Sequence, residues 1–458
     1  MTVRREPPGP RLERNPLKQI QLAMQFRRDP LGAFLGMRER FGDVFSLQFG
    51  KGLNYVLTHP DDMYEVLVTK AGSFHKHPDL KSGRTGLGRF IGNGLLTSDG
   101  EFWKRQRQLA SPALHTRRVA AYAATMVELT LGMLRRWSGG AALSISREMN
   151  MLTMRIVAKT LLGSDVSEAI ESVGRAMIEV QGVAGPPPMM PPWLPTPREL
   201  RRRQARRILD DVVYGFIREW RAKSEDRGDL LSMLLLARDG DEHGMTDEEA
   251  RDELVTFFLA GHETVANALN WTWFLLAQNP EAEARLHDEI DSILGDRPPA
   301  FTDLEHLPYT EMILKESMRL YPPAWIVSRQ AMEAVQVGEY VMPEGTAVHL
   351  VIYAAHHDAR WWPQPEAFVP ERFSRAEGAH LNKHAYMPFG AGPRVCVGKP
   401  FALMEGRLLI ATIAQRYFLR PRPGDDVEKD ALITLRPRGG LHMTVHPRVR
   451  SAARANSA

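Results

Sequence analysis

The stretch from Met245 to Pro280 predicts a single helix of about thirty residues, which is unusually long for a globular domain. Its start carries a capping-box pattern, Thr246 followed by Glu249, and Asn279-Pro280 ends it. A helix that is apolar on nearly all sides is buried in a core, not laid on a surface. The apolar positions include Phe257, Phe258, Leu259, Trp271, Trp273, Phe274 and Leu275. We therefore expect this helix to cross the core of a large domain.

A short polar segment, Ala260-Gly261-His262-Glu263-Thr264, interrupts this apolar helix. A buried carboxylate or hydroxyl costs free energy unless it finds a hydrogen-bond partner, so these groups in a core helix indicate a functional site. Glu263 can relay protons, and Thr264 can hydrogen-bond a bound oxygen species. The alternative is a kinked helix whose polar groups are hydrated.

The loop from Phe389 to Gly398 contains Cys396, the only cysteine among 458 residues. A thiolate is an axial ligand of haem iron in one class of haem protein. The glycines of this loop let the backbone turn tightly and approach a flat cofactor. Arg394 could meet a haem propionate, and Phe389 gives the sulfur an apolar wall. Without this pattern, a lone cysteine is usually a small buried hydrophobe.

The full pattern Phe-x-x-Gly-x-Arg-x-Cys-x-Gly resembles the haem-binding loop of the cytochrome P450 superfamily. The segment from Ala260 to Thr264 resembles the oxygen-activation motif of the same family, with Glu263 where Asp is commoner. The resemblance implies a haem b cofactor with Cys396 as the iron ligand, and catalytic roles for Glu263 and Thr264. His262 occupies a variable position of the motif, and no role is assigned to it.

Further cofactor contacts follow from the same resemblance. Trp103 and Arg107 stand four residues apart, so they share one face of a helix and could both donate to a propionate. An aromatic-basic pair of this kind is also common on amphipathic helices, but here it matches the family's equivalent helix. Arg329, in an extended segment, is the third propionate candidate. With these, the predicted cofactor contacts are Trp103, Arg107, Arg329, Phe389, Arg394, Cys396 and Gly398.

A structural lock is predicted from three charged residues. Glu316 and Arg319 stand three apart on a helix and can pair, although an exposed pair contributes little to stability. Together with Arg372, they match the family's Glu-Arg-Arg triad, which lies behind the haem and has no catalytic role.

The substrate is expected to be lipophilic. The resemblance to bacterial carotenoid and fatty-acid hydroxylases leaves two classes open, a terpenoid or carotenoid and a fatty acid. The turn before Leu441 resembles the family's C-terminal hairpin, which enters the substrate pocket. The predicted pocket residues are Leu259, Ala260, Trp325, Ile326, Val327 and Leu441. Whether the proline-rich linker over residues 182–197 touches a membrane stays open.

Electrons are expected to come from an external protein, because too few residues follow Cys396 for a flavin domain. Lys104, Arg105, Lys399 and Arg407 could form a basic face for an acidic ferredoxin or flavodoxin. An ordinary solvated surface would explain the same charges.

Two other functions remain possible from the residues. One is a haem-thiolate peroxygenase or hydroperoxide isomerase that does not activate O2, and the other is a non-catalytic haem-binding protein. In peroxygenase relatives, Arg and Pro replace the acid and the alcohol of the long helix. Glu263 and Thr264 therefore favour a monooxygenase that uses O2 and two electrons to hydroxylate a lipophilic molecule.

The fold class implied by the resemblance is mainly α with a minor β region, as one cytochrome P450 domain over residues 17–450. Residues 1–16 and 451–458 are expected to be disordered. The net charge of +4 is too small to suggest nucleic acid. The sequence has no signal-peptide pattern and no apolar run long enough for a transmembrane helix, so we expect a cytoplasmic protein without a transmembrane segment.

Local patterns predict several further elements. Helical spacing runs from Leu17 to Arg40 with a break at Asp29-Pro30, and alternating residues from Val44 to Thr58 predict a hairpin. We expect mostly loop from Phe74 to Gly94 and mostly helix from Arg118 to Asp211.

Overall fold

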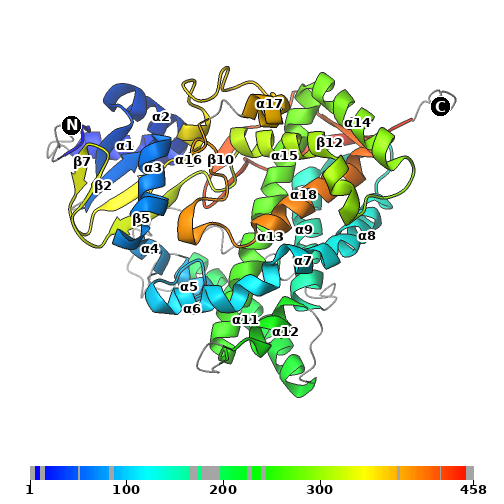
Figure 1. The fold of residues 1–458 in the computed structure, drawn as a ribbon, viewed down its shortest axis with the longest axis horizontal. Helices are drawn as coiled ribbons and strands as arrows, with labels where there is room; N and C mark the ends of the chain where they lie inside the picture. The colour runs from blue at the N-terminus through cyan, green and yellow to red at the C-terminus, as the bar shows by residue number, and fades with distance from the viewer. Residues whose placement is uncertain are drawn as a thin grey trace.

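The structure is a computed structural model that describes residues 6–10, 16–49, 52–81, 87–163, 173–174, 176, 196–223, 229–238, 244–378, 382–422 and 424–449. A β-rich part and a larger helical part lie side by side, with the long helix α13 (Asp247–Gln278) running between them (Figure 1). Among the described residues, no helix is both long and apolar enough to cross a membrane.

Helix α13 is the long core helix that the sequence predicts, so that prediction is confirmed. Both hydrogen bonds of the capping box form: the Glu249 amide donates to the Thr246 hydroxyl over 3.1 Å, and the Thr246 amide donates to the Glu249 carboxylate over 2.8 Å. This box satisfies two of the amides that a helix start leaves without partners. Most of the helix is buried.

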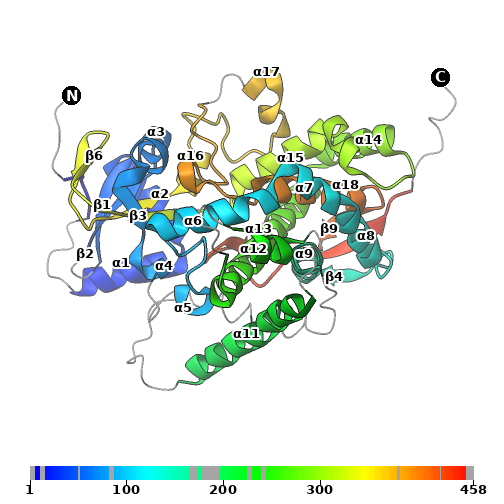
Figure 2. The ribbon, with the colours of Figure 1, turned by 60° about the horizontal axis from the view of Figure 1, so that its bottom comes forward.

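The other helices of the larger part pack around α13 and against one another. They are α8 (Ala123–Leu134), α9 (Ile145–Leu162), α11 (Pro197–Lys223), α12 (Leu230–Leu236), α14 (Pro280–Leu294), α15 (Pro308–Leu320) and α18 (Lys399–Ala414). Figure 2, in which the bottom of the molecule is turned forward, shows α11 along one edge.

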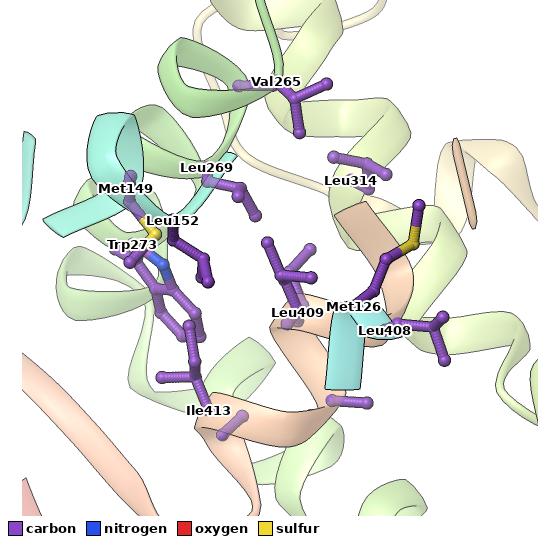
Figure 3. Close-up of a cluster of buried hydrophobic side chains, with 14 of the residues drawn as sticks. Met126, Met149, Leu152, Val265, Leu269, Trp273, Leu314, Leu408, Leu409 and Ile413 are labelled. Atoms are coloured by element: carbon purple, nitrogen blue, oxygen red, sulfur yellow. The ribbon is translucent and has the colours of Figure 1, made fainter. Parts of the chain in front are cut away.

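The main hydrophobic core forms where α9, α13 and α18 meet. Leu152 of α9, Leu269 of α13, and Leu409 and Ile413 of α18 point toward one another (Figure 3). Each fully buried side chain of this size contributes about 1.5–3 kcal/mol relative to exposure. This packing fixes α18, and therefore the loop just before it, against the central helix.

The β-rich part is built on a five-stranded sheet in the order β1-β2-β8-β5-β3. Its strands are β1 (Val44–Phe49), β2 (Gly52–Leu57), β3 (Phe74–Lys76), β5 (Val327–Ala331) and β8 (Ala347–Leu350). Strands β2 and β8 are parallel and the other neighbours are antiparallel. The sheet brings β3, early in the chain, beside β5, which lies more than half the chain away.

Three smaller sheets complete the strands of the described residues. Their strands are β4 (Ala142–Ser144), β12 (His442–Pro447) and β9 (Tyr417–Pro421) in one sheet, β6 (Val335–Val337) and β7 (Tyr340–Met342) in another, and β10 (Lys429–Ala431) and β11 (Leu435–Pro437) in the last.

The remaining helices are short or lie near the β-rich part. They are α1 (Pro16–Arg28), α2 (Pro30–Phe41), α3 (Pro60–Tyr64), α4 (Pro78–Lys81), α5 (Gly88–Ile91), α6 (Gly100–Ala110), α7 (Thr116–Val119), α16 (Ile352–His356) and α17 (Arg375–Gly378). The break at Asp29-Pro30 and the β1-β2 hairpin are as predicted.

Two local predictions were wrong, at least in part. The stretch from Phe74 to Gly94 is not mostly loop, because β3 forms by pairing with a distant strand and α4 and α5 follow it. The described residues from Arg118 to Asp211 are mostly helical, as predicted, with the short strand β4 between α8 and α9. Residues 6–10 are not disordered: the carbonyl oxygen of Pro8 accepts a hydrogen bond of 2.8 Å from the Ser46 amide. Residues 182–195 and 451–458 lie outside the described residues.

Candidate active site

The loop before α18 has a backbone that only glycine adopts easily. Gly390 and Gly392 have φ angles of +68° and +70°, in the left-handed region. A Cβ on Gly392 would overlap the carbonyl oxygen of Leu67, whereas a Cβ on Gly390 would meet nothing within 4 Å. The Cys396 amide then donates a hydrogen bond of 2.9 Å to the Phe389 carbonyl, which closes the loop.

The Cys396 side chain has an unusual environment. Its side chain is exposed, yet burial by the surrounding protein raises the pKa of its thiol above the usual value. The backbone amides of Gly398 and Lys399 and the charge of Arg107 lower the pKa of this thiol in turn. The start of α18 also points its positive dipole end toward the sulfur. These donors and charges suit a thiolate that binds a metal.

One turn of α13 opens in the same region. Ala260 is exposed and Gly261 and Thr264 are partly exposed, although most of the helix is buried. Val397, next to the cysteine, packs against the apolar cluster that contains Leu259. The cysteine loop and this turn of α13 therefore border one apolar region.

The acid and the alcohol of the motif face different surroundings. The Thr264 hydroxyl donates a hydrogen bond of 2.7 Å to the Ala260 carbonyl, on the open side. Glu263 is 5% exposed and accepts a hydrogen bond of 2.6 Å from the Thr434 hydroxyl. Burial lowers the pKa of His262 to about 4, so this side chain is neutral at pH 7.

Three of the predicted propionate contacts lie together. The Arg107 guanidinium donates to the Val395 carbonyl over 2.8 Å, within the cysteine loop. Arg394 pairs with Asp99, and its guanidinium lies 4.2 Å from the centre of the Trp103 ring. Helix α6 and the cysteine loop are thus joined through these side chains.

Arg329 has a neighbour that sequence reasoning missed. In the antiparallel register of β3 and β5, Lys76 lies directly opposite Arg329, and both side chains are buried. Like charges in this position repel. Burial and the nearby Arg394 lower the pKa of Arg329 to about 10 and hold the pKa of Lys76 well below its usual value.

The balance of charge around these cations bears on whether a haem would fit the site. Among the described residues, Asp99 is the carboxylate whose charge acts on all three cations, Lys76, Arg329 and Arg394. Three cations and one carboxylate leave an excess of positive charge in a buried place, which costs free energy without an anion. The two propionates of a haem would supply that anion, and Cys396 would supply the iron ligand. The residues present fit the group.

The predicted lock is assembled and buried. Two nitrogens of Arg319 donate to Glu316, each over 2.8 Å, and the Arg372 guanidinium lies 3.3 Å from the same carboxylate. Glu316 and Arg319 are fully buried. The remaining donors of Arg319 reach the carbonyls of His356, Pro365 and Ala367. The triad therefore ties α15 to the segment that precedes the cysteine loop.

The predicted pocket residues divide into two groups. Leu259, Ala260, Ile326 and Val327 lie on α13 or on the segment that enters β5, and all but Leu259 are at least partly exposed. Trp325 is buried, and its indole N–H donates to the Leu432 carbonyl over 2.9 Å.

Leu441 was predicted wrongly as a pocket residue. It is 0% exposed within the main core, so it contributes no surface to an opening. In the neighbouring hairpin, Ile433, between β10 and β11, packs against the apolar cluster that contains Leu259, as Val397 does.

Three of the four cations expected on a basic docking face already have a carboxylate partner. Arg105 donates to the Glu249 carboxylate over 3.1 Å and to the Gly244 carbonyl over 3.0 Å. Arg407 pairs with Glu311 and with the Leu304 carbonyl. Lys104 pairs with Glu101 over 2.6 Å but remains exposed, and Lys399 is exposed as well.

Comparison with known proteins identifies the family. The model of the family described as Cytochrome P450 matches residues 7–442. The chain is 35% identical over 433 residues to cyclooctatin synthase of Streptomyces melanosporofaciens, with 93% of each chain covered. It is 37% identical over 412 residues to cyclooctat-9-en-7-ol 5-monooxygenase of the same organism, covering 88% of this chain and 87% of the relative. The crystal structure of the haem domain of cytochrome P450DA superposes with a TM-score of 0.87 over 98% of both chains, at 23% identity, which shows the fold. The chain therefore belongs to the cytochrome P450 family, and it is a haem-containing monooxygenase.

Proposed function

We propose that this enzyme hydroxylates a terpenoid-type small molecule bound against the open turn of α13. The observation that carries the proposal is the exposed Ala260 on an otherwise buried helix, in the apolar region that Cys396 also borders. An apolar wall with few polar groups selects a lipophilic substrate by exclusion of water.

Named side chains would hold the haem. Cys396 would be the iron ligand, and Lys76, Arg329 and Arg394 would meet the propionates, with Trp103 and Arg107 beside them. When bound, the haem supplies the oxidation: O2, two electrons and two protons convert a C–H bond to C–OH and release water. The chain contributes the ligand, the charges and the shape of the site.

Proton handling is assigned to two residues of α13. Thr264 has its hydroxyl at the open side, where it can accept a hydrogen bond while it donates to the Ala260 carbonyl. Glu263 lies on the buried side and can take up a proton and pass it toward Thr264 through water. This pair favours oxygen activation over the peroxygenase and carrier alternatives.

The terpenoid class is preferred over fatty acids for two reasons. The relative named cyclooctat-9-en-7-ol 5-monooxygenase acts on an unsaturated alcohol without a carboxylate. Lys76, Arg329 and Arg394 are already assigned to the propionates, and Arg107 already donates to the Val395 carbonyl. A fatty-acid carboxylate needs a cation of its own.

Turnover under isotopically labelled oxygen tests this function. With a surrogate ferredoxin and its reductase, we expect a cyclic terpene alcohol to give a hydroxylated product that carries one oxygen atom from O2. A panel of fatty acids serves as the comparison and is expected to give little product. Hydroxylation of fatty acids alone would contradict the substrate class. Product formed only with added hydrogen peroxide would support the peroxygenase alternative instead.

The electron donor is proposed to be an acidic ferredoxin or flavodoxin that docks at Lys399, the first residue of α18, and Lys104 of α6. Charge reversal at both lysines is expected to slow reduction by the donor protein about tenfold at low salt, because steering depends on opposite charges. Stopped-flow reduction measures this, with chemical reduction by dithionite as the control. An unchanged rate with the donor protein would remove the docking site.

A further inference from the structure

The hairpin formed by β10 and β11 is hydrogen-bonded to α13 and to the segment before β5. The indole N–H groups of Trp325 and Trp271 donate to the carbonyls of Leu432 and Leu435 over 2.9 and 3.1 Å. The Leu435 amide donates to the Pro323 carbonyl over 3.0 Å. These bonds fix the backbone on both sides of residues 433 and 434.

Thr434 of this hairpin completes a chain of hydrogen bonds on α13. The side-chain amide of Asn267 donates to the Thr434 hydroxyl over 3.1 Å, and that hydroxyl donates to the Glu263 carboxylate over 2.6 Å. Glu263 and Asn267 stand four residues apart, so they lie on one face of the helix. All three side chains are buried, with exposures between 3% and 6%.

The direction of this chain matters for the acid. Both hydrogen bonds point the same way, from the Asn267 amide through the Thr434 hydroxyl to Glu263, and aligned bonds strengthen one another in a low-dielectric interior. A donor to a carboxylate favours its ionised form and fixes its orientation. Thr434 therefore acts on the group that is proposed to take up protons.

We propose that Thr434 is a positioning residue for Glu263, which holds one carboxylate oxygen on the buried side of α13 and so sets how well Glu263 passes protons toward Thr264. The inference rests on the proposed proton-handling role of Glu263. Ile433, the preceding residue, packs against the apolar cluster that contains Leu259. The same hairpin thus contacts both the apolar wall and the acid.

Two variants at residue 434 separate the hydroxyl from the shape of the side chain. Thr434→Val keeps the volume and removes the donor, and Thr434→Ser keeps the donor. With valine, product formed per electron pair consumed is expected to fall about tenfold, the factor that corresponds to one lost hydrogen bond to a charged group. Serine is expected to retain most of this yield.

Other measurements exclude a merely structural effect. The substrate dissociation constant, the thermal unfolding midpoint and the ferrous–CO spectrum are expected to stay unchanged in both variants. In the infrared difference spectrum of the resting protein, the carboxyl band identified by Glu263→Gln is expected to shift with valine and not with serine. An unshifted band would overturn the inference without any assay of turnover.

Combination with Glu263→Gln separates this inference from the proposed function. If Glu263→Gln alone leaves the product yield unchanged, the proposed role of Glu263 fails. If it lowers the yield and Thr434→Val does not, Thr434 is not the positioning residue. If both lower it, valine should add nothing in the Glu263→Gln background, and an added loss would overturn the inference.

Asn267→Leu, which removes the donor to Thr434, is expected to lower the yield about threefold and provides a second variant if valine prevents folding.

Discussion

Replacement of Arg319 by leucine is expected to destabilise the folded protein by about 3–5 kcal/mol, because it leaves the Glu316 carboxylate buried and poorly compensated. Both residues are fully buried, and the guanidinium supplies two hydrogen bonds of 2.8 Å to that carboxylate. It also serves the carbonyls of His356, Pro365 and Ala367, which lose their donor. This loss is a large fraction of the stability of a typical domain.

Urea unfolding followed by circular dichroism measures the effect of Arg319→Leu. Arg438→Leu is the matched control, because Arg438 forms an exposed ion pair with Glu428, with side-chain exposures of 48% and 57%. Such a surface pair is worth about 0–1 kcal/mol, so the control should unfold almost as the parent does. Equal destabilisation by the two variants would show that the buried triad does not lock the fold.

Replacement of Gly392 by alanine is expected to prevent the cysteine loop from taking its native shape. The new Cβ would overlap the backbone carbonyl oxygen of Leu67, which cannot move aside as the end of a flexible side chain can. Overpacking of this kind typically costs about 1–3 kcal/mol and sometimes more, in addition to about 1–2 kcal/mol for a left-handed φ. We expect a variant that folds poorly or binds less than a tenth of the parent's haem.

Gly390→Ala provides the control for this prediction. Gly390 has nearly the same φ angle, +68° against +70°, but a Cβ there would meet nothing within 4 Å. It should therefore show the conformational cost alone, about 1–2 kcal/mol, and retain most of its haem. Haem content per protein and the thermal midpoint compare the two variants. If both bind haem equally well, the contact with Leu67 does not shape the loop.

The parts of the site that could be predicted from sequence are those whose patterns are local. The capping box of Thr246 and Glu249 and the apolar run after it specify a long buried helix without reference to the rest of the chain. The loop around Cys396 depends on glycines within the same few residues. Trp103 and Arg107 share a helical face by spacing alone.

The parts that were missed depend on contacts between distant segments. Lys76 becomes a cofactor-site candidate only because β3 pairs with β5, which places it opposite Arg329. Thr434 becomes a partner of Glu263 only because its hairpin folds onto α13, at a sequence separation of 171 residues. Neither residue belongs to a motif, and no local periodicity distinguishes it from a surface residue.

The wrong predictions have the same origin. Leu441 follows a glycine turn that looks suited to entering a pocket, yet its side chain is taken into the main core. Arg105 and Arg407 look like surface cations in the sequence, yet each meets a carboxylate of another helix. Charge and turn patterns predict a surface or a bend, but the segments that pack against them decide their role.

Cys396 is assigned as the ligand of the haem iron, and the ferrous–CO difference spectrum of the purified holoprotein tests this assignment most directly. We expect a Soret band shifted strongly to the red, as thiolate ligation produces, and the loss of that band in Cys396→Ser with the protein still folded. A protein that binds no haem, or a spectrum that Cys396→Ser leaves unchanged, would contradict the assignment of this loop as the cofactor site.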